Sequence, residues 1–312
     1  MKEVDLLVLG DANPDLVVRG GDVVPAFGQA EHLVDDVRLV AGGSGGILAC
    51  GASRLGLRVA FSGVVGDDLF GRFVRDELER AGVDVNGLAV DPTRPTGLTV
   101  VLSGERDRAM LTMPGTIGDL RESLIDPDLI GRARHVHVSS YFLQRSLARD
   151  VPELFDLAHQ AGATTSIDPN WDPAERWDGG LTQALDRTDV FLPNLHEATS
   201  IARTSNADEA IRTLSEHARL VVVKAGERGA VAARGGELVT MPALTVQPVD
   251  ATGAGDTFDA GFLAMWLGGE PLERCLAFAN ASGALSTLGV GGTAAQPTID
   301  QVLVAIERGF AA

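Results

Sequence analysis

Residues 250–261 read Asp-Ala-Thr-Gly-Ala-Gly-Asp-Thr-Phe-Asp-Ala-Gly, a glycine-rich turn that runs into an apolar, helix-forming segment. The amino end of a helix has unpaired N–H groups and a partial positive charge, so it can hold a phosphoryl group during transfer. Gly253 and Gly255 lack a Cβ and let the backbone come close to a ligand. Asp256 stands at the junction, where a carboxylate is useful if it takes a proton from an attacking hydroxyl. The stretch therefore predicts a phosphoryl-transfer site with Asp256 as its base.

A purely structural interpretation of Asp256 stays open at this point. Aspartate is a preferred residue at the start of a helix, and glycine is common in any turn. Asp256 would then only cap a helix over 257–268, and the rest of the chain has to decide between the two interpretations.

Short apolar runs alternate with longer amphipathic segments along the chain. Runs typical of strands lie at 4–10, 58–65, 135–140, 163–168, 188–192 and 219–224. Patterns typical of helices lie at 45–56, 69–81, 148–161, 195–202, 207–217, 257–268 and 271–288. Buried runs that alternate with helices predict a parallel sheet with helices on both faces.

Two regions, 15–40 and 96–113, break this alternation because they are richer in the pattern of exposed strands. In the second region, apolar residues at 98–102 and 109–113 flank a Gly-Glu-Arg-Asp turn, which predicts a hairpin. These regions therefore predict β-structure outside the main sheet.

Five glycine-rich or charged motifs follow one another in order along residues 10–290. They are Gly-Gly-Ser-Gly-Gly at 42–46, Gly-Asp-Asp-Leu-Phe-Gly at 66–71, Pro-Asn-Leu-His-Glu at 193–197, Lys-Ala-Gly-Glu-Arg-Gly-Ala at 224–230 and Asp-Ala-Thr-Gly-Ala-Gly-Asp at 250–256. By these motifs the chain resembles the PfkB/ribokinase family of carbohydrate kinases, although Ala251 stands where that family usually has Thr. Each motif is weak alone, and the order of all five makes the resemblance specific.

The resemblance implies a ribokinase-like α/β fold, with a doubly wound, mostly parallel sheet and helices on both faces. The whole chain, 1–312, would form a single kinase domain, with lid strands from about 15–40 and 96–113 as a small β-sheet over the sugar site. The activity implied is ATP-dependent transfer of the γ-phosphoryl group to a primary hydroxyl of a sugar or sugar-like small molecule. Asp256 would be the general base, and the backbone amides of Gly253, Ala254, Gly255 and Asp256 would form the anion hole.

The resemblance also implies an acceptor site at the carboxyl ends of the strands, where ligands bind in doubly wound sheets. Its candidate residues are Asn13, Asp15, Gly42, Gly43, Gly45, Ser140 and, on the lid turn, Arg106. The polar residues near the first strand could instead form a turn. The glycines could likewise belong to a tight turn, which is compatible with a substrate packed against bare backbone.

For ATP, the resemblance implies a binding site made by Asn194, Lys224, Gly226, Gly229, Asn280 and Gly283. Glu197 would hold Mg²⁺ through water, because Mg²⁺ keeps several waters and takes few direct carboxylates; Asp168 is the next candidate. Asp250 and Thr252 resemble a monovalent-cation site, for K⁺, that part of the family has. Alternatives remain: Glu197 could serve the helix dipole and Lys224 could be a solvated surface charge.

Two departures from the family pattern bear on the acceptor. A sugar-binding Asn of ribokinase is replaced by Gly46 or Ile47, and a Glu after the middle strand is replaced by a residue of 139–141. Because each hydrogen bond to a charged group contributes about 1.5–3 kcal/mol, ribose is disfavoured. The Asp-Pro-Asn-Trp run at 168–171 is similar to fructokinases and 2-keto-3-deoxygluconate kinases. A 2-keto-3-deoxygluconate kinase and a nucleoside kinase of this fold stay as alternatives.

Composition and charge exclude several other classes of protein. A formal net charge of −17 argues against binding to nucleic acid or anionic membranes, which needs clustered Lys and Arg. Cys50 and Cys275 match no zinc or redox spacing and are expected to be buried thiols. The acidic first residues and the lack of a membrane-length apolar run predict a cytoplasmic protein. A homodimer through the lid is common among relatives, and the sequence neither supports nor excludes it.

Three other classes of function fit the sequence less well. An NAD-binding protein would need Gly-x-Gly-x-x-Gly directly after the first strand, and the loop at 42–46 has neither the spacing nor the place. A P-loop kinase would need Gly-x-x-x-x-Gly-Lys-Ser/Thr, which the chain lacks. A catalytically silent sugar-binding regulator is expected to lose its base, and Asp256 is present. The sequence therefore favours an enzyme.

Overall fold

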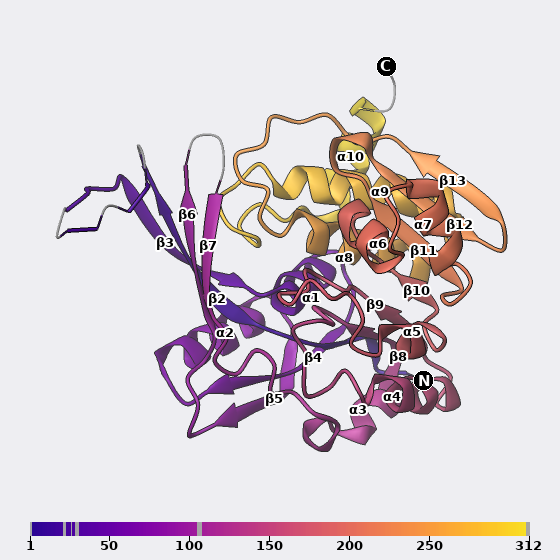
Figure 1. Cartoon of the computed structure of the whole chain (residues 1–312), viewed down its shortest axis with the longest axis horizontal. Helices are drawn as coiled ribbons and strands as arrows, with labels where there is room; N and C mark the ends of the chain where they lie inside the picture. Colours follow the sequence, from indigo (N-terminus) through magenta and orange to yellow (C-terminus); the bar gives the residue numbers. More distant parts are fainter. Residues whose placement is uncertain (1, 21–22, 26, 29–30, 105–107, 310–312) are drawn as a thin grey trace.

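The computed structural model of the chain describes residues 2–20, 23–25, 27–28, 31–104 and 108–309. Arg106 lies outside the described residues. The strands form two separate sheets, a nine-stranded sheet and a four-stranded sheet (Figure 1).

The large sheet has the strand order β13-β12-β11-β10-β9-β8-β1-β4-β5. Its strands are β1 (Val4–Leu9), β4 (Val59–Gly66), β5 (Asp84–Asp91), β8 (Ala133–Val138), β9 (Thr164–Ile167), β10 (Val190–Phe191), β11 (Leu220–Lys224), β12 (Ala230–Arg234) and β13 (Glu237–Met241). Neighbouring strands are parallel except at β12, which is antiparallel to both of its neighbours. The predicted mostly parallel sheet is confirmed.

Helices cover both faces of this sheet, as the alternation of strands and helices predicted. One face packs on α1 (Ser44–Arg54), α2 (Leu69–Arg80), α8 (Ala254–Leu267), α9 (Leu272–Ser286) and α10 (Ile299–Gly309). The other packs on α3 (Pro127–Arg132), α4 (Val151–Gln160), α5 (Leu181–Leu185), α6 (Leu195–Ile201) and α7 (Ala207–Leu214). Two 3-10 turns, η1 (Glu122–Leu124) and η2 (Gly226–Arg228), complete the set. Each face buries its own apolar cluster, which is the arrangement that a doubly wound sheet requires.

The small sheet projects from the body of the molecule at the left of Figure 1. Its order is β3-β2-β6-β7, formed by β2 (Asn13–Arg19), β3 (Asp36–Gly42), β6 (Leu98–Ser103) and β7 (Arg108–Met113). The hairpin predicted over 98–113 is confirmed, because Leu98 pairs with Met113 in an antiparallel register. On one face of this sheet Val17 and Val101 are buried against Val290.

Some elements differ from the predicted ones for identifiable reasons. The helix predicted at 257–268 begins at Ala254, because Gly253 adopts a left-handed conformation (φ 72°) and starts the helix one turn earlier. The strand β5 was not predicted, since Asn86 and Gly87 interrupt its apolar pattern at the edge of the sheet. The segments β12, β13, α3, α5 and α10 were also not predicted. None of the described helices is long and apolar enough to cross a membrane.

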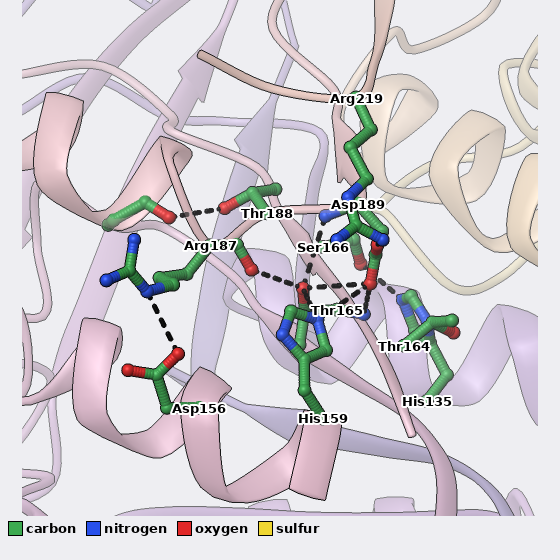
Figure 2. Close-up of polar contacts among 11 residues, drawn as sticks. His135, Asp156, His159, Thr164, Thr165, Ser166, Arg187, Thr188, Asp189 and Arg219 are labelled. Atoms are coloured by element: carbon green, nitrogen blue, oxygen red, sulfur yellow. Dashed lines mark hydrogen bonds and ion pairs between the residues drawn. The ribbon is translucent and has the colours of Figure 1, made fainter. Parts of the chain in front are cut away.

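A polar network holds the amino ends of β9 and β10 together (Figure 2). Asp189 accepts hydrogen bonds from the backbone N–H of Thr165 (2.9 Å) and from Arg219 Nη1 (3.0 Å). His159 Nε2 lies 2.9 Å from the same carboxyl group. We call these four residues the Asp189 network. It fixes the edge of the sheet that is opposite to the predicted ligand site.

Candidate active site

The site predicted from sequence lies at the carboxyl ends of the strands, where the order of the large sheet reverses. From β1 the chain continues through β4 to β5 on one side, and it then returns to place β8 on the other side of β1. Loops on the two sides of such a reversal separate and leave a crevice. Six residues from different elements meet here. Asp11, Ser140, Asp168 and Asn194 come after β1, β8, β9 and β10, Lys224 is the last residue of β11, and Asp256 lies at the amino end of α8.

The first turn of α8 has no side-chain cap among the described residues. Gly253 occupies the N-cap position, and no side chain hydrogen-bonds to the N–H groups of the first turn of this described helix. The interpretation of Asp256 as a capping residue is therefore wrong. Glycine is required at 253, because a Cβ there would lie 2.8 Å from the Cα of Gly292. Gly255 is helical, and a Cβ on it would meet nothing closer than the Lys224 ammonium at 3.8 Å, which leaves the first turn open.

Asp256 lies in this first turn with its carboxyl group surrounded by neighbouring side chains, although the residue is partly exposed as a whole. Burial raises the pKa of Asp256 to about 8, and the Asp168 carboxylate adds to the effect. The Lys224 ammonium and a hydrogen bond from the Ser44 hydroxyl act in the opposite direction. A carboxyl group with a pKa close to neutrality can both take up and release a proton, which suits a general base.

Lys224 is buried in an ion cluster and is not a solvated surface charge. Its Nζ lies 2.6 Å from Asp168 Oδ2 and 2.8 Å from Asp259 Oδ2, and its side chain is 11% exposed. Burial alone would lower the pKa of Lys224, but the two carboxyl groups outweigh burial and raise it. Burial raises the pKa of Asp259 well above its usual value, which favours its protonated form. No role was predicted for Asp259, which lies one turn after Asp256.

A pocket of about 590 Å³ opens beside the first turn of α8, which is within the usual size of a small-molecule site. It is lined by five of the predicted nucleotide residues, Lys224, Gly226, Gly229, Asn280 and Gly283, and by Ala254 and Gly255. Asn194 is not among its lining residues. The loop over 243–248 also lines the pocket and was not predicted, because it has no charged or glycine-rich signature.

Asn280 and Gly283 shape the wall of this pocket from α9. The Asn280 side chain donates hydrogen bonds to the carbonyl oxygens of Met241 (3.1 Å) and Pro242 (3.0 Å), which holds the loop after β13 against the helix. A Cβ on Gly283 would lie 2.9 Å from the carbonyl oxygen of Ala254, so glycine lets α9 pack closely on α8. Close packing of helices thus accounts for Gly283 and agrees with its place in the pocket.

Glu197 and Asn194 form a reciprocal capping box at the start of α6. The Glu197 N–H donates to Asn194 Oδ1 (2.9 Å), and Glu197 Oε2 accepts from the Asn194 N–H (2.7 Å). Burial, and then the Asp168 carboxylate, raises the pKa of Glu197 to about 7. Among the described residues, no group of three or more His, Cys, Asp or Glu side chains has an arrangement that could hold a metal ion. Any metal here would thus depend on few protein ligands, as Mg²⁺ does.

Asn13 and Asp15 are buried where β2 begins, and neither residue lines the pocket. The Asn13 side chain donates to Asp15 Oδ1 at 3.3 Å. A Cβ on Gly42 would clash with the Asp15 carboxyl group, and a Cβ on Gly43 would lie 2.9 Å from Asn13 Oδ1. The glycines are therefore explained by the close approach of these two side chains. A Cβ on Gly45 would in the same way lie 2.7 Å from the carbonyl oxygen of Asp11.

Three polar residues join the predicted ones here: Asp11, Ser44 and Asn170. Asn170 Nδ2 donates to Ser44 Oγ (3.0 Å) and to Ser140 Oγ (2.9 Å). Ser140 and Asn170 both have left-handed backbones, with φ 53° and φ 52°. Such conformations in residues other than glycine are costly and cluster at functional sites. Their positions were the one local signal: Ser44 begins α1, Asp11 lies two residues after β1 and Asn170 lies three residues after β9.

Asp250 and Thr252 join two loops near the start of α8. Asp250 Oδ1 accepts from the N–H (2.9 Å) and the hydroxyl (2.7 Å) of Thr252, and Asp250 Oδ2 accepts from the N–H of Gly291 (2.9 Å). The predicted monovalent-cation residues thus lie in one place and order the turn that precedes Gly253.

Comparison with known proteins agrees with this geometry. The chain is 32% identical over 309 residues to the ATP-dependent ribose-1-phosphate kinase of Halopiger xanaduensis, which covers 98% of this chain and 99% of the relative. It is 32% identical over 314 residues to the fructokinase of Klebsiella pneumoniae, over 95% of this chain and 97% of the relative. An E. coli protein assigned as a ribokinase II, solved with ATP and Mg²⁺, superposes with a TM-score of 0.86 at 25% identity and covers 98% of this chain and 99% of its own. The family model described as pfkB family carbohydrate kinase matches residues 4–299, and this chain therefore belongs to the PfkB family of carbohydrate kinases.

Proposed function

We propose that this kinase transfers the γ-phosphoryl group of ATP to a primary hydroxyl of a sugar or sugar-like small molecule. One observation carries the proposal: Ala254 and Gly255 in the uncapped first turn of α8 line the pocket of about 590 Å³, while Asp256 in the same turn interacts with Ser44 and Asp11 near the end of β1. Nucleotide on one side and acceptor on the other would place the transferred group at this turn. The named activities of the relatives and the ATP and Mg²⁺ bound to the E. coli neighbour support this arrangement.

In this proposal Asp256 takes the proton of the acceptor hydroxyl as the hydroxyl oxygen attacks the γ-phosphorus, and the bond from that phosphorus to the β,γ-bridging oxygen breaks and releases ADP. The N–H groups of residues 253–256 hold the negative charge that develops on the phosphoryl oxygens, as helix amino ends do. The buried carboxyl group of Asp256 is close to the phosphoryl path without forming part of the pocket lining. The whole chain would act as a single kinase unit, with the small sheet as the lid that keeps water from the acceptor.

The nucleotide would occupy the pocket lined by Lys224, Gly226, Gly229, Asn280 and Gly283. Glu197 would hold Mg²⁺ through water, because its buried carboxyl group lies beside Asp168 and Lys224 at the same edge of the sheet. Asp168 remains the second candidate, but its Oδ2 is already paired with the Lys224 ammonium. Bound Mg²⁺ would supply positive charge to a site that has several carboxyl groups and one lysine.

We also propose that K⁺ binds near Asp250 and Thr252. The support is that these residues join the loops over 249–252 and 287–291 directly before the anion site. A cation at this point would order the turn that ends at Gly253. Turnover should then be higher in KCl than in equimolar choline chloride, and equal rates in the two salts would remove the proposal.

The acceptor itself is tested by a panel of compounds. ADP release with Mg·ATP would be measured with fructose, ribose, ribose 1-phosphate, a 2-keto-3-deoxy sugar acid and a nucleoside. We expect one class to exceed the others by about 100-fold in kcat/KM, as a site with specific hydrogen bonds allows. ATP hydrolysis that no compound accelerates would overturn the proposal and favour a sugar-binding regulator.

We further propose that the protein forms a homodimer through its small sheet. The face opposite Val17 is apolar in its cross-strand pairs, which include Leu16, Val18, Val37, Leu39, Leu98, Val100, Leu102, Ala109, Leu111 and Met113. Leu111 is 63% and Val37 is 52% exposed. An open apolar sheet face can be covered by a second copy of the same face, since two sheets pack about 10 Å apart. Analytical ultracentrifugation should show a dimer that Leu111→Lys converts to a monomer, and a monomeric unmodified protein would contradict this.

A further inference from the structure

Asn170 is held in one orientation at the edge of the candidate active site. Its backbone is left-handed (φ 52°), and its N–H donates to Asp168 Oδ1 at 2.8 Å. Its side-chain oxygen accepts from the N–H of Trp171 at 2.6 Å. The oxygen is therefore directed to the backbone, and the amide nitrogen with its two protons is directed the other way, toward the site.

The two amide protons of Asn170 reach two serine hydroxyls that come from different parts of the chain. Ser44 is the first residue of α1, and Ser140 lies two residues after the end of β8. Asn170 Nδ2 lies 3.0 Å from Ser44 Oγ and 2.9 Å from Ser140 Oγ. A hydroxyl group that accepts such a bond still has one proton to donate.

Each serine hydroxyl faces a buried carboxyl group to which it can donate that proton. The Ser44 hydroxyl favours the ionised form of Asp256, and the Ser140 hydroxyl favours the ionised form of Asp11. Asn170 thus begins two series of polar contacts. One leads to Asp256, the candidate base, and the other leads to Asp11 near the end of β1. We call the first of these, from Asn170 through Ser44 to Asp256, the Ser44 branch.

We propose that Ser44 and Asn170 are positioning residues for the catalytic base: they fix the direction of the Asp256 carboxylate and favour its ionised form. This inference rests on the proposed role of Asp256 as the base. The physical reason is that a hydrogen bond donated to a carboxylate stabilises the charged form over the neutral one. Asn170 acts through Ser44. Because the Asn170 amide donates a hydrogen bond to each serine oxygen, the hydroxyl proton of each serine is free to point at a carboxyl group.

The Ser44 branch opposes other groups around Asp256. Burial and the Asp168 and Asp11 carboxyl groups favour the protonated form of Asp256, and the Lys224 ammonium favours the ionised form. Removing the Ser44 hydroxyl should therefore raise the pKa of Asp256 further and leave less of the active base at neutral pH. The titratable groups that face Asp256 or its neighbours from the surrounding elements are Asp11, Asp168, Glu197, Lys224 and Asp259.

The test is the pH profile of kcat/KM for Ser44→Ala with the acceptor identified by the panel. We expect the acidic limb to move up by about one pH unit, with a loss of about 10-fold at neutral pH that shrinks at higher pH. Ser44→Thr keeps a hydroxyl and should keep the limb in place. Alanine is a good helix former, so the first residue of α1 tolerates it.

Ser140→Gly is the matched control, because Gly accepts the left-handed backbone and the variant cuts only the other branch. Asp11 would then hold its proton more firmly, which weakens its effect on Asp256, so the limb should stay or move down. An equal upward shift in Ser44→Ala and Ser140→Gly would overturn the inference, as would an unmoved limb in Ser44→Ala. Near-normal turnover in Asp256→Asn would instead overturn the proposed base, so the two failures are distinct.

Discussion

An aspartate is buried at each end of strands β9 and β10, and the two aspartates differ in how many donors and cations surround them. Asp189, at the amino end, is 6% exposed and receives bonds from Thr165, His159 and Arg219 (Figure 2). Asp168, at the carboxyl end, is 5% exposed and shares a single ammonium with Asp259. The first carboxylate is fully matched by donors. The second belongs to a group with more carboxyl groups than cations.

This difference separates stability from chemistry within one sheet. A buried carboxylate with enough donors stays ionised and ties strands together. An excess of buried carboxyl groups raises their pKa values, as at Asp256 (about 8) and Glu197 (about 7), and such shifts are typical of functional sites. The variants below test this contrast.

Asp256→Asn should have the largest effect on activity. Loss of a positioned general base lowers kcat by about 10²–10⁴-fold, and kinetics with saturating Mg·ATP would measure it. The unmodified enzyme should gain activity as pH rises through about 8, because the base must be ionised.

Stability provides the control for Asp256→Asn. A raised pKa means that the folded state binds a proton that the unfolded state releases, so stability from this group is lost as pH rises through about 8. Asn has no such loss, so the melting temperature of Asp256→Asn relative to the unmodified protein should rise between the unfolded pKa of about 4 and pH 8 and stay constant at higher pH. Near-normal kcat, or a melting temperature lower at every pH, would contradict the assignment.

Lys224→Met should have the largest effect on stability. It leaves Asp168 buried without its cation, and removal of one partner of a buried ion pair costs about 3–5 kcal/mol. Urea unfolding would measure the loss as a lower midpoint. Asp259→Asn is the matched control: burial favours the protonated form of Asp259, so Asn should cost less than about 1 kcal/mol. Equal losses would mean that both carboxyl groups are ionised.

The sequence predicts the sheet well and this ion cluster poorly. Apolar runs such as 219–224 identify strands because burial on both faces leaves a pattern in neighbouring residues. The pairing of Lys224 with Asp168 and Asp259 joins residues 56 and 35 positions away, which no local pattern encodes. One compositional signal existed: Lys2 and Lys224 are the two lysines of a chain whose other permanently cationic side chains are arginines. A lysine at 224 therefore fits a space that requires a compact ammonium.

The candidate site is likewise predictable only in part. Asp256 and the glycines around it are found from the turn-to-helix pattern, because anion binding requires that local structure. The start of α8 at Ala254 depends on the left-handed Gly253, which a sequence pattern does not specify. Asp11, Ser44 and Asn170 escape because their importance comes from contacts between loops, and Ser44 and Asn170 are 126 positions apart.

Glu197→Gln should change the metal dependence of the reaction. Residues that hold a metal through water typically contribute about 10–100-fold to affinity or activity, so the Mg²⁺ concentration for half-maximal rate should rise by that factor. Glu209→Gln is the matched control. Glu209 is the third residue of α7 after the N-cap Asn206, as Glu197 is the third residue of α6 after its own N-cap asparagine. Identical Mg²⁺ titrations for the two variants would mean that Glu197 only caps α6, and Asp168 would then be the candidate for holding Mg²⁺.

Arg219→Ala should have the smallest effect and defines the other end of the contrast. The Arg219 side chain is 78% exposed, and an exposed ion pair contributes only about 0.2–1 kcal/mol. Asp189 would keep its bonds from the Thr165 N–H and from His159, so no buried charge is left alone. Urea unfolding should show a slightly lower midpoint with an unchanged slope, and kcat should stay the same, because Arg219 lies at the opposite edge of the sheet from Asp256. A loss as large as that of Lys224→Met would mean that the charges at the two ends of these strands are held in the same way, and the separation of stability from chemistry would not stand.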